Sequence, residues 1–331
     1  MAQATWPTFL VWLCTSRCNL RCIHCYTWGR FRGPELSTEE ALKMVEEAAE
    51  LGVVHLAITG GEPFLREDVF EVARSAVEHG LRISFTTNAT LLNEDIVREL
   101  RELEAFVFIS LDGADREVCD SIRGEGTWRR ALRSLAELRS YGVEYSTIMT
   151  VNSLNYKQAR KFVLLNEAVG SWEAIFLPLI PVGRAGERRS LLPTPDQLAE
   201  CLREAEEAVE EVGYRAGIWC APFASRLIRS KRLYVYACPD RTLDVAPNGD
   251  VLLCDTLDLR VGNVKEGVQR AWEEYVAFRE DYLAGREVGN MDPCSTCPQK
   301  DFCQGGCLAR AYLLAGDILK PDPLCPLVAK A

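Results

Sequence analysis

Residues 18–25 of the chain are Cys-Asn-Leu-Arg-Cys-Ile-His-Cys, which places Cys18, Cys22 and Cys25 at C-x3-C-x2-C spacing. Three thiolates can hold three irons of a [4Fe–4S] cluster, whose usual complement is four cysteines, and the fourth iron is then open to a ligand. A structural zinc site needs four ligands, and His24 is poorly placed to supply the fourth. The stretch therefore favours iron–sulfur ligation over zinc or a structural cysteine-rich loop.

Outward from this stretch, β-prone apolar segments alternate with helical patterns as far as Gly213. Six strands alternating with six helices predict a parallel sheet with right-handed crossovers. Because six units are fewer than the eight of a closed barrel, we expect a partial (β/α)6 TIM-like barrel, with its chemistry at the carboxyl ends of the strands. The expected strands are 8–13, 53–58, 81–85, 106–109, 143–151 and 174–180; the expected helices are 37–51, 67–79, 93–103, 127–141, 156–168 and 194–213.

Four motifs directly follow expected strands and should meet at one rim: the cysteine stretch, Gly60-Gly61-Glu62-Pro63, Thr86-Thr87-Asn88 and Ser110-Leu111-Asp112-Gly113. Two glycines after a strand let the backbone approach a ligand closely, although a tight strand-to-helix turn is the alternative. Asn88 could instead cap a helix, and Asp112 could hold the geometry of its loop.

The cysteine motif with Tyr26 after its third cysteine, together with Gly-Gly-Glu-Pro, resembles radical S-adenosylmethionine (radical SAM) enzymes. The resemblance implies that the open iron chelates the methionine moiety of S-adenosylmethionine. Ser110 matches a position near the methionine carboxylate, and Arg123 could pair with that carboxylate as a fork, with a surface salt bridge as the alternative. The implied cofactor-binding residues are Tyr26, Gly60, Gly61, Glu62, Pro63, Thr87, Asn88, Ser110 and Arg123.

The segment Pro181-Val182-Gly183-Arg184-Ala185 follows the sixth expected strand and should form a loop over the same rim. We take Arg184 as a candidate substrate contact. The Gly-Arg-Ala sequence is similar to that of the haem-biosynthesis and quinone-cofactor branches of the family, but it is too short to choose between them.

After Gly213 the alternation stops. Residues 214–237 are expected to form a bridge with one short helix, and 238–331 a second, loop-rich domain that needs metal to stabilise its small core. Its cysteines have a distinctive spacing: Cys238-x10-Gly249-x4-Cys254, then Cys294-x2-Cys297-x5-Cys303-x3-Cys307, then Cys325 after seventeen more residues. This pattern resembles the SPASM domain of a subgroup of radical SAM enzymes; two zinc ribbons are the alternative.

The SPASM resemblance implies two auxiliary [4Fe–4S] clusters. Cys294, Cys297, Cys303 and Cys325 would hold the second, and Cys307 would cross to the first, with Cys238 and Cys254. Cys220 is a candidate for the fourth ligand of the first cluster, and an open iron that binds substrate is the alternative.

Asp255 directly follows Cys254. In the anaerobic sulfatase-maturating branch of the family, an acidic residue at this place is a proposed base, so Asp255 is the candidate catalytic residue, with a structural hydrogen-bonding role as the alternative.

Composition limits the remaining possibilities. The 331 residues carry a net charge of −10, which argues against binding along a nucleic-acid backbone. No apolar run reaches about 18 residues, so no membrane helix is expected. The first residues carry no secretion signal, so we expect a cytoplasmic protein. Fourteen cysteines then point to clusters, because the cytosol keeps thiols reduced and disfavours disulfides.

We therefore expect a radical SAM/SPASM enzyme, supplied with electrons by a low-potential donor such as ferredoxin or flavodoxin. The hydrogen atom would be taken from a peptide or protein side chain. No N-terminal peptide-recognition domain is expected, since about ten residues precede the first strand. A tetrapyrrole or another small metabolite is the second possibility, and a non-catalytic multi-cluster electron carrier is the third.

Overall fold

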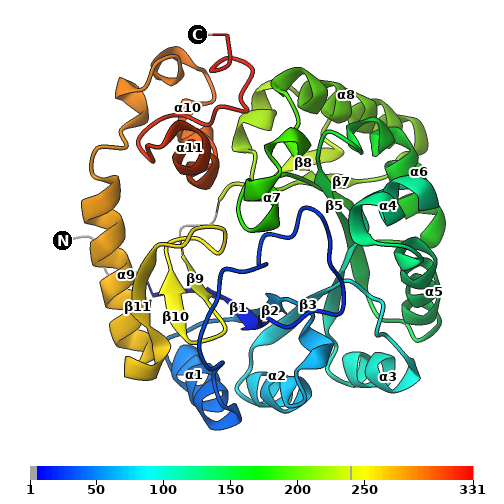
Figure 1. Cartoon of the computed structure of the whole chain (residues 1–331), viewed down its shortest axis with the longest axis vertical. Coiled ribbons are helices and arrows are strands. Elements are labelled where there is room, and N and C mark those ends of the chain that lie inside the picture. Colours follow the sequence, from blue (N-terminus) through cyan, green and yellow to red (C-terminus); the bar gives the residue numbers. More distant parts are fainter. Residues whose placement is uncertain (1–5, 239–240, 331) are drawn as a thin grey trace.

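The computed structural model describes residues 6–238 and 241–330. In these ranges eleven strands form one sheet in the order β11-β10-β9-β1-β2-β3-β4-β5-β6-β7-β8, which curves into an incomplete barrel with helices outside it (Figure 1). The strands are β1 (Phe9–Thr15), β2 (His55–Gly60), β3 (Arg82–Thr87), β4 (Phe106–Ser110), β5 (Tyr145–Val151), β6 (Ala174–Pro178), β7 (Ala216–Ile218), β8 (Leu233–Val235), β9 (Thr242–Val245), β10 (Asp250–Leu252) and β11 (Arg260–Asn263).

The expected partial barrel is confirmed, because β1 to β6 are parallel and each is followed by at least one helix. The α-helices are α1 (Thr38–Glu50), α2 (Val69–Glu78), α3 (Glu94–Glu102), α4 (Arg116–Arg123), α5 (Thr127–Ser140), α6 (Ala159–Val169), α7 (Arg184–Glu187), α8 (Pro195–Val212), α9 (Val268–Leu283), α10 (Lys300–Cys303) and α11 (Leu308–Ala315). Short 3-10 turns are η1 (Pro63–Leu65), η2 (Tyr156–Gln158), η3 (Arg189–Leu191), η4 (Pro222–Arg226), η5 (Val264–Glu266), η6 (Val288–Asn290) and η7 (Cys294–Thr296).

Local sequence fixes where several helices begin. Ser37 accepts a hydrogen bond from the Glu40 backbone, and the Glu40 carboxylate accepts one from the Ser37 backbone, so both halves of the capping box form. Thr194 and Gln197 make the same pair at the start of α8. Among the described residues, no helix is both long enough and apolar enough to cross a membrane.

The C-terminal half departs from the expectation. The segment 214–237 contributes β7 and β8 to the sheet and the turn η4, where a single short helix was expected. Strand β9 pairs in parallel with β1, and β10 and β11 continue the sheet antiparallel beyond β9. Helix α9 buries Val268, Ala271, Trp272 and Tyr275 in the same core as β1 and α1. The sheet thus crosses both expected domain boundaries, although most of the described residues after 238 lie outside helices and strands, as expected.

Candidate active site

The segment 16–36, here called the cluster loop, leaves the carboxyl end of β1 and carries Cys18, Cys22 and Cys25. The Gly-Gly-Glu-Pro motif packs directly under it. The Gly61 backbone donates to the Thr15 oxygen at 2.7 Å, and the Glu62 backbone donates to the Arg17 oxygen at 2.8 Å. A Cβ on Gly61 would lie 2.0 Å from the Arg17 oxygen. The close backbone approach that the glycines allow is therefore made by the cluster loop itself.

Glu62 connects the ends of two neighbouring strands. Its buried carboxylate accepts hydrogen bonds from the Thr87 hydroxyl at 2.7 Å and the Asn88 backbone at 2.9 Å. Burial raises the pKa of Glu62 to about 7, against the opposing effect of these donors. The Asn88 amide donates to the Asn19 side chain at 2.9 Å. These three predicted cofactor-binding residues therefore hold the cluster loop on its β3 side.

Arg184 holds the loop on its other side. Its backbone N–H donates to the Cys25 oxygen at 2.9 Å and its Nη1 to the Cys22 oxygen at 2.8 Å. Its guanidinium lies 4.1 Å from the centre of the Trp28 ring. Gly183 has a φ of +59°, and a Cβ there would lie 2.6 Å from the Cys25 oxygen. Arg184 was predicted as a substrate contact, but its hydrogen bonds go to the backbone of the cluster loop.

Arg123 lies beneath the cluster loop. It pairs with Asp112 at 2.6 Å, and His24 contacts the same Asp112 oxygen at 3.0 Å. Both members of the Arg123–Asp112 pair are buried, at 8% and 0% exposure, so the alternative of a surface salt bridge is wrong. Burial alone would raise the pKa of Asp112, but the charges of Arg123 and His24 outweigh it and hold that pKa at about 2. Ser110, at the end of β4, is partly exposed.

The three cysteines of the cluster loop lie close enough for their charges to interact. Burial raises the pKa of Cys22 to about 11 against the opposing charge of Arg123, the other two cysteines add to the rise, and burial also raises the pKa of Cys18. Thiols in such a site become thiolates when a metal ion supplies positive charge. The loop, with three thiols in a backbone held from two sides, fits a cluster with one open iron.

The structure brings four further cysteines together beside the carboxyl end of the barrel. Burial, followed by the charges of Cys307 and Cys238, raises the pKa of Cys220. Burial also raises the pKa of Cys254, followed by the charges of Asp255 and Asp244 and then by those of Cys238 and Cys307. Cys220 has a φ of +54°, a left-handed conformation that costs a non-glycine residue energy. Cys220, Cys238, Cys254 and Cys307 thus form a second candidate iron site, with four thiols rather than three.

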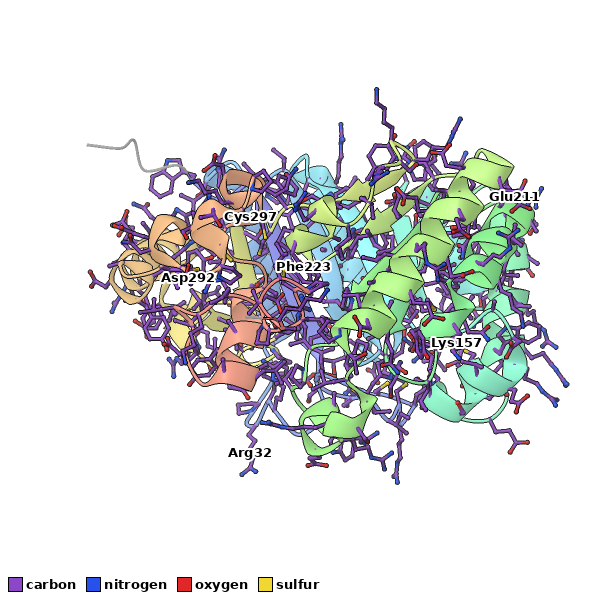
Figure 2. The ribbon with its side chains drawn as sticks, turned by 90° about the horizontal axis from the view of Figure 1, so that it is seen from above. Arg32, Lys157, Glu211, Phe223, Asp292 and Cys297 are labelled. Atoms are coloured by element: carbon purple, nitrogen blue, oxygen red, sulfur yellow. The ribbon has the colours of Figure 1, made fainter. Side chains whose placement is uncertain are left out.

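Cys294, Cys297, Cys303 and Cys325 line one pocket, together with Phe223, Arg226 and Lys300. Figure 2 labels Phe223 and Cys297 on the side of the molecule where α10 and α11 lie. Cys307 follows Cys303 by four residues but is not among the residues that line this pocket. The cysteines of the C-terminal region therefore form two separate groups among the described residues. Cys307 is close in sequence to the pocket-lining group but belongs to the group with Cys220, Cys238 and Cys254.

Asp255 lies between the cluster loop and the second cysteine group. Its carboxylate accepts a hydrogen bond from the Cys254 thiol, whose Sγ lies 3.7 Å away, and interacts with the Tyr26 hydroxyl. Arg30 of the cluster loop donates to the Asp255 backbone oxygen at 2.7 Å. Burial raises the pKa of Asp255, and Arg30 opposes that shift. Tyr26, predicted as a cofactor contact, is thus one of two cluster-loop residues that reach Asp255, and Arg30 is the other.

Sequence reasoning missed Asp244, whose Oδ2 accepts the Asp255 backbone N–H at 2.9 Å. One ligand atom from each of Asp244, Cys254 and Asp255 lies within 4.8 Å of the others. The only sequence signal for Asp244 was a carboxylate between Leu243 and Val245 in an apolar strand.

The profile of the radical SAM superfamily matches residues 12–165, and that of the SPASM iron–sulfur cluster-binding domain matches residues 237–298. An AdoMet-dependent heme synthase from Methanosarcina barkeri is 31% identical over 98% of this chain and 98% of its own. A mycofactocin maturase from Mycobacterium tuberculosis is 30% identical over 96% of this chain and 83% of its own. The chain belongs to the radical SAM superfamily and carries a SPASM domain.

A solved structure, native anSMEcpe with bound AdoMet and Cp18Cys peptide, superposes with a TM-score of 0.75 at 20% identity over 97% of this chain and 94% of that one. It shares the mixed α/β fold with a parallel sheet. Members of the superfamily use a [4Fe–4S] cluster and S-adenosylmethionine, and the SPASM domain binds auxiliary iron–sulfur clusters.

Proposed function

We propose that this protein oxidises a side chain of a peptide or protein by removing a hydrogen atom from that side chain. The observation that carries the proposal is the position of Asp255, which contacts Tyr26 beside one cysteine group and Cys254 in another. A carboxylate between a radical site and an auxiliary cluster suits a two-electron oxidation in which the substrate loses a hydrogen atom to the radical, a proton to the carboxylate and one electron to the auxiliary cluster.

Each residue group has a distinct part in this proposal. Cys18, Cys22 and Cys25 would hold the first cluster. The cluster together with bound S-adenosylmethionine would supply a 5′-deoxyadenosyl radical that abstracts hydrogen. The cofactor would lie against Ser110 and the Gly-Gly-Glu-Pro turn. Asp255 would accept the substrate proton, Tyr26 would orient its carboxylate, and Arg30 would hold its backbone oxygen.

Replacing Asp255 by Asn tests this assignment. We expect 5′-deoxyadenosine to form as in the wild type, because Asp255 does not hold the first cluster, while oxidised peptide falls by about 100-fold or more. The peptide would be the precursor encoded beside the gene, assayed by mass spectrometry. Asp281→Asn, on the exposed surface of α9, is the control. Unchanged peptide oxidation in Asp255→Asn would remove the residue from the mechanism.

We also propose three [4Fe–4S] clusters, with Cys220 as the fourth ligand of the first auxiliary one. The second auxiliary cluster would be held by Cys294, Cys297, Cys303 and Cys325. Cys220→Ala should change the electron paramagnetic resonance signal of one reduced cluster and leave the signal assigned to the cluster-loop site intact. Cys201→Ala, a buried helix cysteine, is the matched control. A spectrum identical to the wild type would favour an iron left open to substrate.

A tetrapyrrole substrate is the second candidate, because the heme synthase relative matches nearly the full length of both chains. Titrating the purified protein with an iron porphyrin separates the two candidates: tight binding with a shifted visible band favours the tetrapyrrole. In either case we propose that a ferredoxin or flavodoxin donates the electrons and that the protein is cytoplasmic. We also propose that the chain divides functionally into residues 1–213, 214–237 and 238–331.

A further inference from the structure

The cysteine sulfurs of the cluster loop have hydrogen-bond donors beside them. The Leu20 backbone N–H donates to the Cys18 Sγ at 3.4 Å, and the Thr27 Oγ1 lies 3.3 Å from the Cys25 Sγ. A thiolate has no proton to give, so once Cys25 binds iron the Thr27 hydroxyl must be the donor of this pair. Hydrogen bonds to the sulfurs are one of the means by which a protein sets the reduction potential of an iron–sulfur cluster.

The donor beside Cys22 carries a full positive charge. Nη1 of Arg123, the last residue of α4, donates to the Cys22 Sγ at 3.9 Å. The Ile23 backbone N–H donates to the Ile122 oxygen at 2.9 Å, which holds the end of α4 against the cluster loop. The Arg123 side chain is buried, so water and salt screen the interaction between its charge and the Cys22 sulfur only weakly.

Asp112 fixes the position of this guanidinium. Its Oδ2 lies 2.6 Å from the Arg123 Nε and 3.0 Å from the His24 Nε2, and its Oδ1 accepts the Thr150 backbone N–H at 2.7 Å. The charge of Arg123 lowers the pKa of Cys22 more than the opposite charge of Asp112 raises it. The ion pair as a whole therefore favours negative charge on Cys22.

We propose that Arg123 and Thr27 act through the sulfurs of Cys22 and Cys25 to raise the reduction potential of the first cluster. The proposal rests on the assignment of Cys18, Cys22 and Cys25 to that cluster. Its reduction takes one electron from the ferredoxin or flavodoxin, and no covalent bond forms or breaks. The reduced cluster carries one more negative charge than the oxidised one, so a positive charge and hydrogen-bond donors at its sulfurs stabilise the reduced form more.

The second cysteine group supplies a matched comparison. Thr256 follows Cys254 by two residues, and its Oγ1 lies 3.2 Å from the Cys254 Sγ, the same arrangement that Thr27 has in the cluster loop. The largest effects of charge on Cys254 come from the carboxylates of Asp255 and Asp244, which raise its pKa. The two sites thus share a threonine donor and differ in the sign of the charge beside it.

The test is a redox titration of anaerobic holoenzyme without S-adenosylmethionine, with the reduced clusters measured by electron paramagnetic resonance. The signal of the first cluster is the one that S-adenosylmethionine changes when it is added afterwards. At the potential where half of the wild-type first cluster is reduced, Arg123→Met should lower the ratio of reduced to oxidised cluster at least tenfold. For a one-electron couple a tenfold change corresponds to about 59 mV.

The threonine variants test the neutral donors. Thr27→Val should lower the same ratio about threefold, because it removes one hydrogen bond and keeps the shape of the side chain. It should leave the auxiliary clusters unchanged. Thr256→Val should do the reverse, with a lower ratio for one auxiliary cluster and the wild-type ratio for the first cluster.

A double variant keeps the test of Arg123 independent of folding. Arg123→Met alone leaves the Asp112 carboxylate buried without its partner, whereas Arg123→Met/Asp112→Asn removes both charges. The double variant should bind iron as the wild type does. Its ratio should fall between those of the wild type and Arg123→Met, because the opposing charge of Asp112 is lost as well.

Wild-type ratios in both Thr27→Val and the double variant would overturn the proposal. A change in the Arg123 variants that appears only after S-adenosylmethionine is added would also overturn it, because that residue would then act on the cofactor and not on the cluster sulfur. Failure of the proposed function is distinguishable: the wild-type protein would then have no signal that responds to S-adenosylmethionine, or would form no oxidised peptide while the shifts in potential remain.

Discussion

Arg310 is the residue that ties the C-terminal segment to the barrel. It is fully buried in α11, pairs with Asp322 at 2.7 Å, and donates to the backbone oxygens of Pro178 at the end of β6 and of Cys220. Asp322 in turn accepts the Cys307 backbone N–H at 3.0 Å. One ion pair therefore fixes the backbone around two members of the second cysteine group.

Replacing Arg310 by Met should destabilise the protein by about 3–5 kcal/mol, because it leaves the Asp322 carboxylate buried without its partner. Urea unfolding of the anaerobic holoenzyme would measure the loss. Arg270→Met is the matched control: Arg270 of α9 pairs with Glu266 and Glu274 on the exposed surface, where solvent screens the charges, so its loss should cost far less stability than that of Arg310. Similar losses in both variants would contradict the structural role of Arg310.

At the scale of elements, the Gly-Gly-Glu-Pro turn and the Gly183–Arg184 turn bind the backbone of the cluster loop on opposite sides. Both act on backbone atoms, so the loop conformation is set by its neighbours more than by its own side chains. This explains why Arg184, a charged residue at the active rim, need not contact substrate.

Gly61→Ala should push the cluster loop away from β2, because the added Cβ would lie 2.0 Å from the Arg17 oxygen. We expect the purified variant to lose about four irons per chain, the content of one [4Fe–4S] cluster, and to form no 5′-deoxyadenosine. Gly289→Ala, where no atom lies within 4 Å of the added methyl, should keep both. Full iron content in Gly61→Ala would show that the loop can adjust.

Local pattern was enough to predict most elements of the barrel. The caps at Ser37, Asn93 and Thr194 are confirmed by their hydrogen bonds, and the four rim motifs follow strands as expected. Long-range contacts were not predictable in this way. The pairing of β9 with β1 leaves no local signal, and neither do the hydrogen bonds that Glu62 and Arg184 make to the cluster loop.

Helix α9 was missed for a different reason. Its buried residues Val268, Ala271, Trp272 and Tyr275 follow helical spacing, but the surrounding cysteines suggested a region stabilised by metal alone. The apolar face of α9 instead packs into the core that contains β1 and α1.

At the scale of the whole molecule, the C-terminal segment completes the barrel sheet rather than standing beside it. A chain that ends at Ala237 lacks β9, β10, β11 and α9, so the edge of β1 and part of the core would be exposed. We expect it to form oligomers or aggregates in size-exclusion chromatography.

The control for this truncation is the full chain with Cys294, Cys297 and Cys303 replaced by Ala, which lacks the second auxiliary cluster but keeps every strand. It should remain monodisperse if the sheet, rather than the metal, holds the two halves together. A soluble, monodisperse truncated chain would show that the barrel folds independently.

The neighbours of β1 also set an order of events on the ribosome. Strand β1 is made before its partner β9, which follows roughly 230 residues later. At about 5–20 residues per second, the β1 edge waits for tens of seconds while the rest of the barrel is synthesised. During that interval a nascent chain carries an unpaired strand next to three reactive thiols, and it is then that a chaperone or a cluster-delivery protein has the best access to both.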